Sequence, residues 1–471
     1  MEAHLIIGGN IEERADRKFV VNPYTKESVS SYPLCGRLDA ERALFAALLA
    51  SKRAKESKRS ERIDWLLDVS SYIKHNREEF AQIITHEVAK PIRFARAEVD
   101  RTVETIKLSA LYAPQVVGKT IPTDICESGF KTESYYKRVP VGVVGAITPF
   151  NYPLNLVAHK IAPALAMGNA VVLKPSPEAP MCAFKLMEAF LKSPHGVNEA
   201  ISLVYGDAEV GNEIVTSDIP RIISFTGSVG VGEIITKNAG IKRLSLELGG
   251  NAATFIDKSA DLKVAAARCA LGAFINSGQV CISLQRIYVE ESIYEEFAEL
   301  LTKESSHLKV GSPFDEETFL SSLIHDDAQN RAIEWIEGAK KEGAEVLYGG
   351  KIEEGVLMPT IMGSVTESMN IVCEEVFAPI VSLIKVRDCD EAFESMNDSP
   401  YGLQFSVFSK NIDIIKKAID ELDAGGIIIN DIPTLRFDAQ PYGGMKYSGI
   451  GKEGPLYAME EFSEIKSIVI I

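Results

Sequence analysis

Three segments of this chain repeat one order: an apolar run, a short loop, and then a stretch with helical spacing. The apolar runs are Val141–Ile147, Ala170–Leu173 and Ile222–Phe225. Repeated strand–loop–helix units favour a parallel sheet with helices on both faces, which is the doubly wound α/β arrangement. Ligands bind at the carboxyl ends of the strands in such sheets, so we expect a site in the loops that follow these runs.

A second α/β series follows Gly250. Its helix-like segment is Leu262–Phe274, and its strand-like segments include Arg286–Val289 and Ile427–Asn430. The chain of 471 residues is long enough for two or three domains, and its 46% apolar and 25% charged content is typical of a globular protein. We therefore predict two α/β domains.

The composition excludes several classes of partner. A formal net charge of −16 disfavours nucleic acid, which needs clustered Lys and Arg. Neither a signal-peptide pattern nor an apolar stretch long enough to span a bilayer occurs, so no membrane association is expected. The seven cysteines and seven histidines are scattered and form no C-x-x-C pair, which indicates a reducing cytoplasm and no metal site.

The chain ends in the apolar, β-prone segment Ser467–Ile471. Left unpaired, such a strand would be an exposed edge and an aggregation hazard. We expect it to add a strand to a sheet, in this subunit or, as we favour, in a partner. We therefore predict a homo-oligomer, either a dimer or a tetramer.

Cys281 and Glu247 each lie among small residues, in the motifs NSGQVC and LELGGN. A thiol is the strongest side-chain nucleophile at neutral pH, and a carboxylate can activate it or a water molecule. Small residues allow a substrate to approach the backbone closely. Taken alone, Cys281 could also be a buried apolar residue, but the pair predicts a nucleophile with its base.

The loop after Ile222–Phe225 places Gly227 and Ser228 directly before a helix. Backbone N–H groups and a hydroxyl at such a turn can bind a phosphate, although similar turns occur as plain connections. The G-x-G-x-x-G fingerprint of standard dinucleotide sites is missing. Lys174 ends the strand Ala170–Leu173, where it could bind a ribose or a phosphate or could simply be solvated.

Asn151 precedes Pro153 at the expected start of a helix, so it is either a cap or an amide that donates to an oxyanion at Cys281. Asn155 and His159 follow at intervals of four residues, which places all three on one helix face. Such a polar stripe suits a substrate with hydroxyl groups. The alternative for His159 is a hydrogen-bonded core histidine.

Seven motifs resemble those of the aldehyde dehydrogenase superfamily, in its order: TPFNYP, LKPS, FTGS, LELGG, GQVC, EVFAP and PYGGMKYSG. The resemblance covers essentially the whole chain. Within the superfamily, the chain is most similar to the branch of archaeal lactaldehyde dehydrogenases and non-phosphorylating glyceraldehyde-3-phosphate dehydrogenases.

This resemblance implies two doubly wound α/β domains, a Rossmann-like cofactor domain and a catalytic domain, with a small β element that bridges subunits. Residues 1–117 and 141–249 would then bind NAD(P), and residues 250–444 would form the catalytic domain. Residues 118–140 and 455–471 would form the oligomerisation element.

The resemblance also implies the chemistry. Cys281 would attack the aldehyde carbon to give a thiohemiacetal, whose oxyanion the Asn151 amide and the Cys281 N–H would hold. Hydride would pass to the nicotinamide and leave a thioester, for whose hydrolysis Glu247 would activate water. Lys160, and Glu464 near the C-terminus, resemble residues of a proton relay.

In the family pattern, Lys174 and Glu375 would hold ribose hydroxyls, Ser228 the pyrophosphate, and Phe377 would pack near the nicotinamide ribose. The full set of residues assigned to the cofactor by this resemblance is Phe150, Lys174, Ser176, Gly227, Ser228, Leu248, Glu375 and Phe377.

Three departures limit this comparison. NAD-preferring members often have a Glu three residues after the lysine, but this chain has Pro177 there and Glu178 one place later. We therefore predict that NADP is accepted as well as NAD. Val280 stands where relatives that act on glyceraldehyde 3-phosphate tend to have Arg. Phe150 replaces the usual Trp.

We predict the oxidation of a short hydroxyaldehyde, lactaldehyde or glyceraldehyde, to its acid. Succinate semialdehyde and glyceraldehyde 3-phosphate are the alternative substrates, for which Arg101 and Arg436 are candidate anion-binding residues. Arg101 could instead pair with Glu98 or Glu104 on its own helix, and Arg436 could lie on a solvated loop.

Two other classes stay open. A thiol hydrolase would use Cys281 and Glu247 but would need no dinucleotide site, and a catalytically silent protein would need neither residue. A CoA-acylating enzyme is disfavoured because those members of the superfamily typically lack the base that Glu247 provides.

Overall fold

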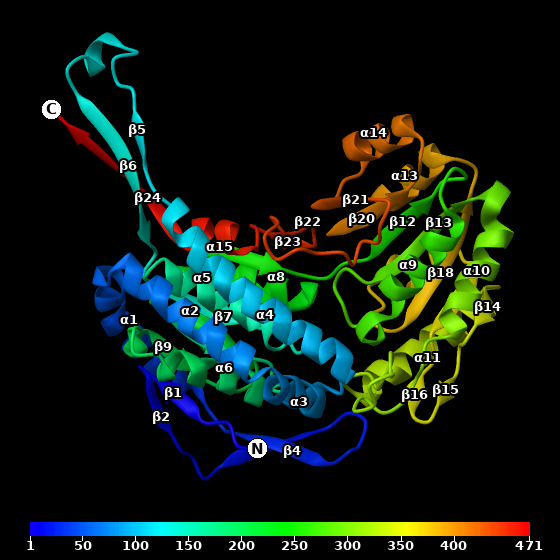
Figure 1. Ribbon diagram of the computed structural model, residues 1–471, viewed down its shortest axis with the longest axis horizontal. Coiled ribbons are helices and arrows are strands. Elements are labelled where there is room, and N and C mark those ends of the chain that lie inside the picture. Colours follow the sequence, from blue (N-terminus) through cyan, green and yellow to red (C-terminus); the bar gives the residue numbers. More distant parts are fainter.

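The computed structural model describes all residues, 1–471, and contains two large sheets and one narrow sheet (Figure 1). The first sheet has eight strands, in the order β2 (Asn10–Glu12), β1 (Leu5–Ile7), β9 (Ile201–Leu203), β8 (Ala170–Lys174), β7 (Val143–Ile147), β10 (Ile222–Thr226), β11 (Arg243–Glu247) and β23 (Gly449–Ile450). The five strands β9, β8, β7, β10 and β11 run parallel to one another. At the two ends of this parallel set, β1 pairs antiparallel with β9, and β23 pairs antiparallel with β11.

Helices cover both faces of the first sheet. One group comprises α1 (Arg37–Glu56), α7 (Ala208–Thr216) and α8 (Val229–Asn238). The other group comprises α2 (Arg59–His75), α3 (Arg77–Val88), α4 (Ile92–Tyr112), α5 (Asn155–Ala166), α6 (Pro180–Lys192) and α15 (Pro455–Glu461). The predicted doubly wound parallel arrangement is therefore confirmed.

The second sheet has seven strands, in the order β14 (Glu345–Tyr348), β17 (Thr360–Gly363), β18 (Ile380–Val386), β13 (Leu284–Glu290), β12 (Ala252–Ile256), β20 (Gln404–Phe408) and β21 (Gly426–Ile429). All neighbours are parallel except β14 and β17. Its helices are α9 (Leu262–Phe274), α10 (Tyr294–Ser306), α11 (Asp326–Lys341), α12 (Asn370–Cys373), α13 (Cys389–Asn397) and α14 (Ile412–Glu421). The second predicted α/β unit is thus present.

The narrow sheet forms an arm that projects from the body of the molecule (Figure 1). It contains β24 (Ser463–Ile470), β6 (Glu133–Pro140) and β5 (Lys119–Ile121), in that order. The preference for a partner subunit was wrong for the C-terminal segment, because β24 pairs along its whole length with β6 of the same chain. The arm's outer edge, on β24, has no neighbouring strand in the chain.

Three two-stranded pairs complete the fold: β3 (Arg17–Val21) with β4 (Ser28–Pro33), β15 (Ile352–Glu353) with β16 (Val356–Leu357), and β19 (Tyr401–Gly402) with β22 (Met445–Lys446). No helix has both the length and the apolar run that crossing a bilayer requires. The exact domain boundaries stay a prediction.

Candidate active site

The strands of the first sheet bring their carboxyl ends to one edge. In the strand register, Lys174 at the end of β8 lies beside Ile147 of β7, and Thr226 of β10 lies beside Glu247 of β11. The Thr148 N–H donates to the Lys174 carbonyl at 3.1 Å, which continues the pairing into the loop after β7. This edge is where parallel sheets bind ligands.

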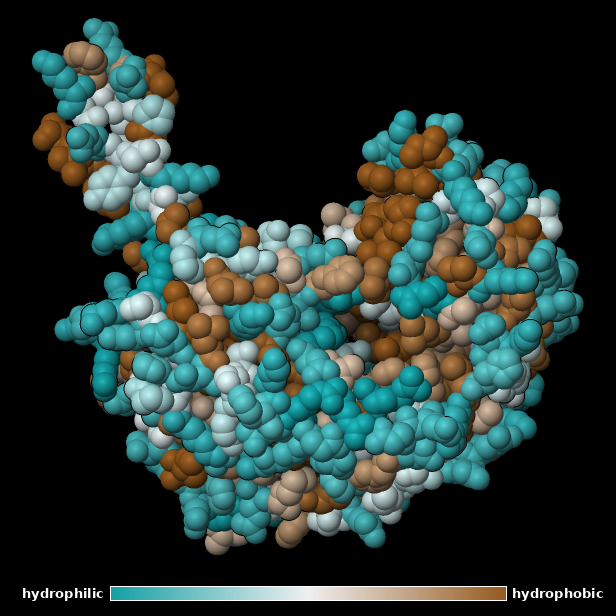
Figure 2. Space-filling view, viewed as in Figure 1, coloured by the Kyte–Doolittle hydropathy of each residue, from teal (hydrophilic) through white to brown (hydrophobic).

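A cavity of about 490 Å³ opens at this edge, in the hollow between the two lobes in Figure 2. Twelve predicted site residues line it: Arg101, Phe150, Asn151, Asn155, Gly227, Ser228, Glu247, Leu248, Cys281, Glu375, Phe377 and Arg436. The predicted residues that do not line it are His159, Lys160, Lys174, Ser176 and Glu464.

The loop before Cys281 has an unusual backbone. Asn276, Ser277 and Gly278 have φ angles of 52°, 55° and 73°, in the left-handed region that non-glycine residues rarely adopt. The Ser277 hydroxyl holds this turn, since it donates to the Ser321 carbonyl at 2.8 Å and accepts from the Ser321 N–H at 3.1 Å. Strain that is held in this way is common next to catalytic groups.

Gly250 allows the motif that carries Glu247 to lie against the nucleophile loop. A Cβ atom at this position would lie 2.2 Å from the Cys281 carbonyl oxygen, which is too close for any side chain. At Gly250 the small residue of LELGGN therefore allows two backbone segments to meet, whereas the sequence pattern predicted the approach of a substrate.

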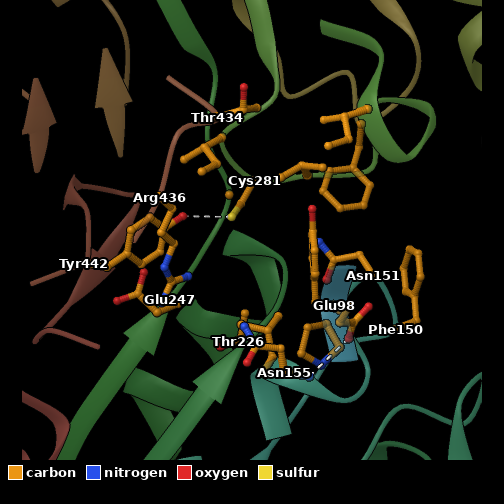
Figure 3. A pocket seen from close by; sticks show the side chains of 18 of the residues that line it. Glu98, Phe150, Asn151, Asn155, Thr226, Glu247, Cys281, Thr434, Arg436 and Tyr442 are labelled. Carbon is orange, nitrogen blue, oxygen red and sulfur yellow. Dashed lines mark hydrogen bonds between the residues drawn. The ribbon is translucent and has the colours of Figure 1, made fainter. Parts of the chain in front are cut away.

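The Cys281 sulfur faces the phenol of Tyr442, with Sγ and Oη 3.1 Å apart (Figure 3). Burial raises the pKa of the Cys281 thiol to about 11, although the Tyr442 hydrogen bond and the Arg436 charge act to lower it. The resting group is therefore a thiol at neutral pH, and it needs a base and a stabilising donor to react as the thiolate.

Glu247 is 3% exposed, and neither of its carboxylate oxygens has a hydrogen-bond partner in the protein. Burial and the nearby Glu453 charge raise the pKa of Glu247 well above its usual value, against the lowering effect of Arg436 and Lys160. A poorly solvated carboxylate with free oxygens is suited to accept a proton from a thiol or from water.

Asn151 lies in the loop before α5, whose first residue is Asn155, so the expectation that Asn151 begins this helix was wrong. Its Nδ2 donates to the Gln279 carbonyl at 3.0 Å, two residues before Cys281. The Asn151 carbonyl accepts from Lys90 Nζ at 2.6 Å, and Lys90 forms a buried ion pair with Glu98. The sequence did not reveal this Lys90–Glu98 pair, which fixes the loop.

Only two members of the predicted stripe of three share a helix face: Asn155 and His159. The Thr105 hydroxyl donates to Asn155 Oδ1 at 3.0 Å, and His159 Nε2 lies 2.9 Å from Asp438 Oδ1. His159 is 1% exposed, and burial lowers its pKa. It is therefore a buried hydrogen-bonded histidine, the alternative that the sequence left open.

Arg101 does not pair with an acid on its own helix. It binds Asp438 through two hydrogen bonds of 3.0 and 2.6 Å, while its side chain lines the cavity. Asp438 lies in the loop before the PYGG motif, and the pKa of its carboxyl is far below its usual range because His159 and Arg101 donate to it.

Arg436 is not on a solvated loop, since its side chain is 8% exposed. Its guanidinium stacks on the Tyr442 ring at 3.6 Å and donates to Glu453 at 3.3 Å. Its Nε is buried and has no hydrogen-bond partner.

The two predicted relay residues, Lys160 and Glu464, do not lie together. Lys160 Nζ is 2.9 Å from Glu453, and both side chains are almost fully buried behind Glu247. Glu464 lies instead on the arm, in β24, where its side chain is 43% exposed and lies 3.9 Å from Arg221. Four acidic residues follow the PYGG motif in the sequence, Glu453, Glu460, Glu461 and Glu464, and only the fold shows which of them meets Lys160.

On the other side of the cavity, Glu375 accepts a hydrogen bond from the Gly250 N–H at 2.8 Å, and burial raises its pKa to about 7. Phe377 and Phe150 meet edge to face, with ring centroids 6.1 Å apart. Ser228 stands at the N-terminus of α8, where its side chain makes no cap hydrogen bond. These groups leave donors and acceptors free for a dinucleotide.

Lys174 is 8% exposed, and its ammonium group has no hydrogen-bond or ion-pair partner in the protein, which leaves it free to bind a ligand. Burial lowers the pKa of Lys174, and the charge of Glu178 opposes this shift. Glu178 accepts a hydrogen bond from Ser176 and lies 3.2 Å from His325 Nε2. The one-residue offset therefore does not remove a carboxylate from Lys174, as the sequence argument had assumed.

The side chains include no cluster of three or more His, Cys, Asp or Glu residues placed to hold a metal.

The profile of the "Aldehyde dehydrogenase family" matches residues 11–468. A lactaldehyde dehydrogenase from Methanococcus aeolicus is 42% identical over 470 residues, 99% of each chain, and a 3-sulfolactaldehyde dehydrogenase from Priestia aryabhattai is 40% identical over 99% of this chain and 97% of its own. The crystal structure of a glyceraldehyde-3-phosphate dehydrogenase from Methanocaldococcus jannaschii with NADP has a TM-score of 0.92 and 39% identity, covering 98% of this chain and 100% of that one.

Proposed function

The chain belongs to the aldehyde dehydrogenase family, and we propose that it oxidises lactaldehyde or glyceraldehyde to the acid with NAD(P). The observation that carries this proposal is the juxtaposition of Cys281 and Glu247 in one cavity, with both carboxylate oxygens of Glu247 unpartnered. A thiol hydrolase would need no dinucleotide site. This cavity is also lined by Ser228 and Glu375, two of the residues predicted to bind the dinucleotide, which favours a dehydrogenase.

Each residue then has one task. Cys281 attacks the aldehyde carbon, and the resulting oxyanion accepts hydrogen bonds from the Asn151 amide and the Cys281 N–H. When bound, NAD(P) would supply the hydride acceptor, and Ser228, Glu375 and Phe377 are the cavity residues that would hold it. Glu247 takes a proton from the water that attacks the thioester, and Lys160 and Glu453 lie behind it as the proposed route for that proton.

The charges around the cavity support an uncharged substrate. Arg101 is already paired with Asp438, and Arg436 is already paired with Glu453. Asn155 lines the cavity, and its Nδ2, which makes one long hydrogen bond of 3.5 Å to Asp438, has a second N–H for a substrate hydroxyl. Val280 adds an apolar wall beside the nucleophile, where it packs with Tyr442.

A second candidate is a hydroxyaldehyde with an anionic end, such as glyceraldehyde 3-phosphate, or succinate semialdehyde. The buried Arg436 Nε favours it, because that donor has no partner in the protein. The names of two of the relatives also refer to aldehydes with a sulfonate or phosphate group.

The test is reduction of NAD and NADP by lactaldehyde, glyceraldehyde, glyceraldehyde 3-phosphate and succinate semialdehyde, followed by absorbance. We expect the highest kcat/KM with an uncharged hydroxyaldehyde. Turnover restricted to the charged aldehydes would replace this proposal with the second candidate, and turnover of none would reject both.

For the cofactor, we propose that NADP is accepted as well as NAD. Lys174 supplies an unpaired cation for a 2′-phosphate, and His325 pairs with Glu178 so that its carboxylate does not face the phosphate unbalanced. The Gly227–Ser228 turn supplies further donors, and Leu248 lines the same cavity. Ser176 acts indirectly, because its hydroxyl donates to Glu178.

Substitution of Glu178 by Gln is expected to tighten NADP binding about tenfold, because it removes a negative charge beside the phosphate, and to leave NAD binding nearly unchanged. Lys174→Ala is expected to weaken NADP binding by a similar factor. Dissociation constants from fluorescence quenching check both, with Glu199→Gln as a remote control. Equal effects on the two cofactors would contradict the assignment.

The oligomer is also a proposal, a homodimer or homotetramer joined through the arm. The outer edge of β24 is unpaired, and its side chains Ile465, Val469 and Ile470 are exposed by 59%, 61% and 51%. An apolar open edge of this length favours burial against another copy.

Seven free cysteines support a location in the cytoplasm.

A further inference from the structure

The Tyr442 hydroxyl is the protein group that contacts the Cys281 sulfur through a hydrogen bond, at 3.1 Å (Figure 3). Tyr442 belongs to the PYGG motif, which the sequence pattern had assigned no task. Its ring lies in the same small apolar cluster as Val280 and Ile282, the two neighbours of the nucleophile.

The Tyr442 phenol is held in place by its backbone pairing, by a contact on one ring face and by burial. The Tyr442 backbone pairs with Glu453 through two hydrogen bonds, of 3.0 and 2.6 Å. The Arg436 guanidinium covers one face of the ring at 3.6 Å, and the residue is 4% exposed. A side chain held in this way keeps its hydroxyl at the sulfur without further ordering.

We propose that Tyr442 positions the Cys281 sulfur and stabilises its thiolate by donating the phenolic hydrogen to Sγ. This inference rests on the proposed function, in which Cys281 is the nucleophile. The stacked Arg436 cation strengthens the donor, because a positive charge on the ring face draws electron density away from the O–H bond.

Tyr442 acts as a donor and does not remove the thiol proton. Burial and the neighbouring Cys281 raise the pKa of its phenol well above the usual value, so it stays protonated at working pH. The thiol proton passes to a base, for which Glu247 is the buried carboxylate in the same cavity. The two residues therefore have separate tasks, one as base and one as hydrogen-bond donor to the anion.

The test is Tyr442→Phe, which keeps the ring and removes the hydroxyl. Iodoacetamide modification of the Cys281 peptide is followed by mass spectrometry against pH, and the thiolate absorbance is titrated against the matching Cys281→Ala protein. Loss of a hydrogen bond to the thiolate should raise the titration midpoint of Cys281 in Tyr442→Phe by about one pH unit. At any pH below that midpoint, iodoacetamide should modify Cys281 about tenfold more slowly than in the wild type. The kcat/KM for the aldehyde should fall at least tenfold, with cofactor binding unchanged.

Tyr152→Phe is the matched control, since Tyr152 lines the same cavity but makes no hydrogen bond to the sulfur. Its Cys281 midpoint should equal that of the wild type. An unchanged or lower midpoint in Tyr442→Phe would overturn the inference, even if activity fell, because that pattern indicates packing alone. The proposed function fails separately, if Cys281→Ala still oxidises aldehydes.

Discussion

Cys281→Ala is expected to lower aldehyde oxidation by at least about 10⁴-fold, because the nucleophile that forms the covalent adduct is lost. The substituted side chain is smaller and the loop is held by Ser277 and Ser321, so the fold should persist. The measurement is reduced-cofactor formation at saturating aldehyde, together with the dissociation constant of NAD(P), which should stay within twofold of the wild type.

Cys373→Ala is the control, because Cys373 is a partly exposed cysteine that does not line the cavity. It should keep wild-type turnover. A Cys281→Ala enzyme that retained a tenth of the wild-type rate would show that the thiol is not the nucleophile. A rate lost together with cofactor binding would indicate a folding defect, which circular dichroism would reveal.

Glu247→Gln is expected to separate the two halves of the reaction. Thiol deprotonation should also slow, because Glu247 is the proposed base for that step, but the thioester still forms and accumulates. One reduced cofactor per subunit should therefore appear in a slowed burst, and hydrolysis should slow by about 10²–10⁴-fold because water loses its base. Rapid-mixing absorbance measures the burst and the steady rate in one trace. Added hydroxylamine, which attacks thioesters without a base, should restore turnover in this variant and not in Cys281→Ala.

The pH dependence gives a second check on Glu247. Only the ionised carboxylate can take a proton, and the pKa of this group is raised by burial. The wild-type hydrolysis rate should therefore climb as pH rises through that pKa, and Glu247→Gln should lose the climb. A burst-free trace with a wild-type pH profile would contradict the assignment of Glu247 as the base.

Much of the fold was predictable because its signals are local. The apolar runs at Val141–Ile147 and Ile222–Phe225 predicted buried strands and contain β7 and β10. These two strands are neighbours in the sheet, so the loops after them meet at one sheet edge. The meeting of Cys281 and Glu247 followed from two motifs of small residues. The start of α5 was misplaced because Pro153 lies inside a turn that precedes the helix rather than in its first turn.

The partners of the charged groups could not be predicted, because they are separated by long stretches of sequence. Several carboxylates of equal chemistry lie near the C-terminus, and only the packing behind Glu247 brings Glu453 to Lys160. Asp438 pairs with Arg101 across 337 residues, and no periodicity marks such a contact. The strand that pairs with the C-terminal segment could not be identified for a similar reason, since β6 is more than 300 residues upstream.

The central claim is that a covalent thioester on Cys281 links oxidation to hydrolysis. Its most direct test is an acid quench of Glu247→Gln during the first turnover with lactaldehyde, followed by mass spectrometry of the Cys281 peptide. We predict that the peptide carries one acyl group when oxidised NAD(P) is present and none when it is omitted. Reduced cofactor formed in full amount with no acyl group on Cys281 would contradict the account.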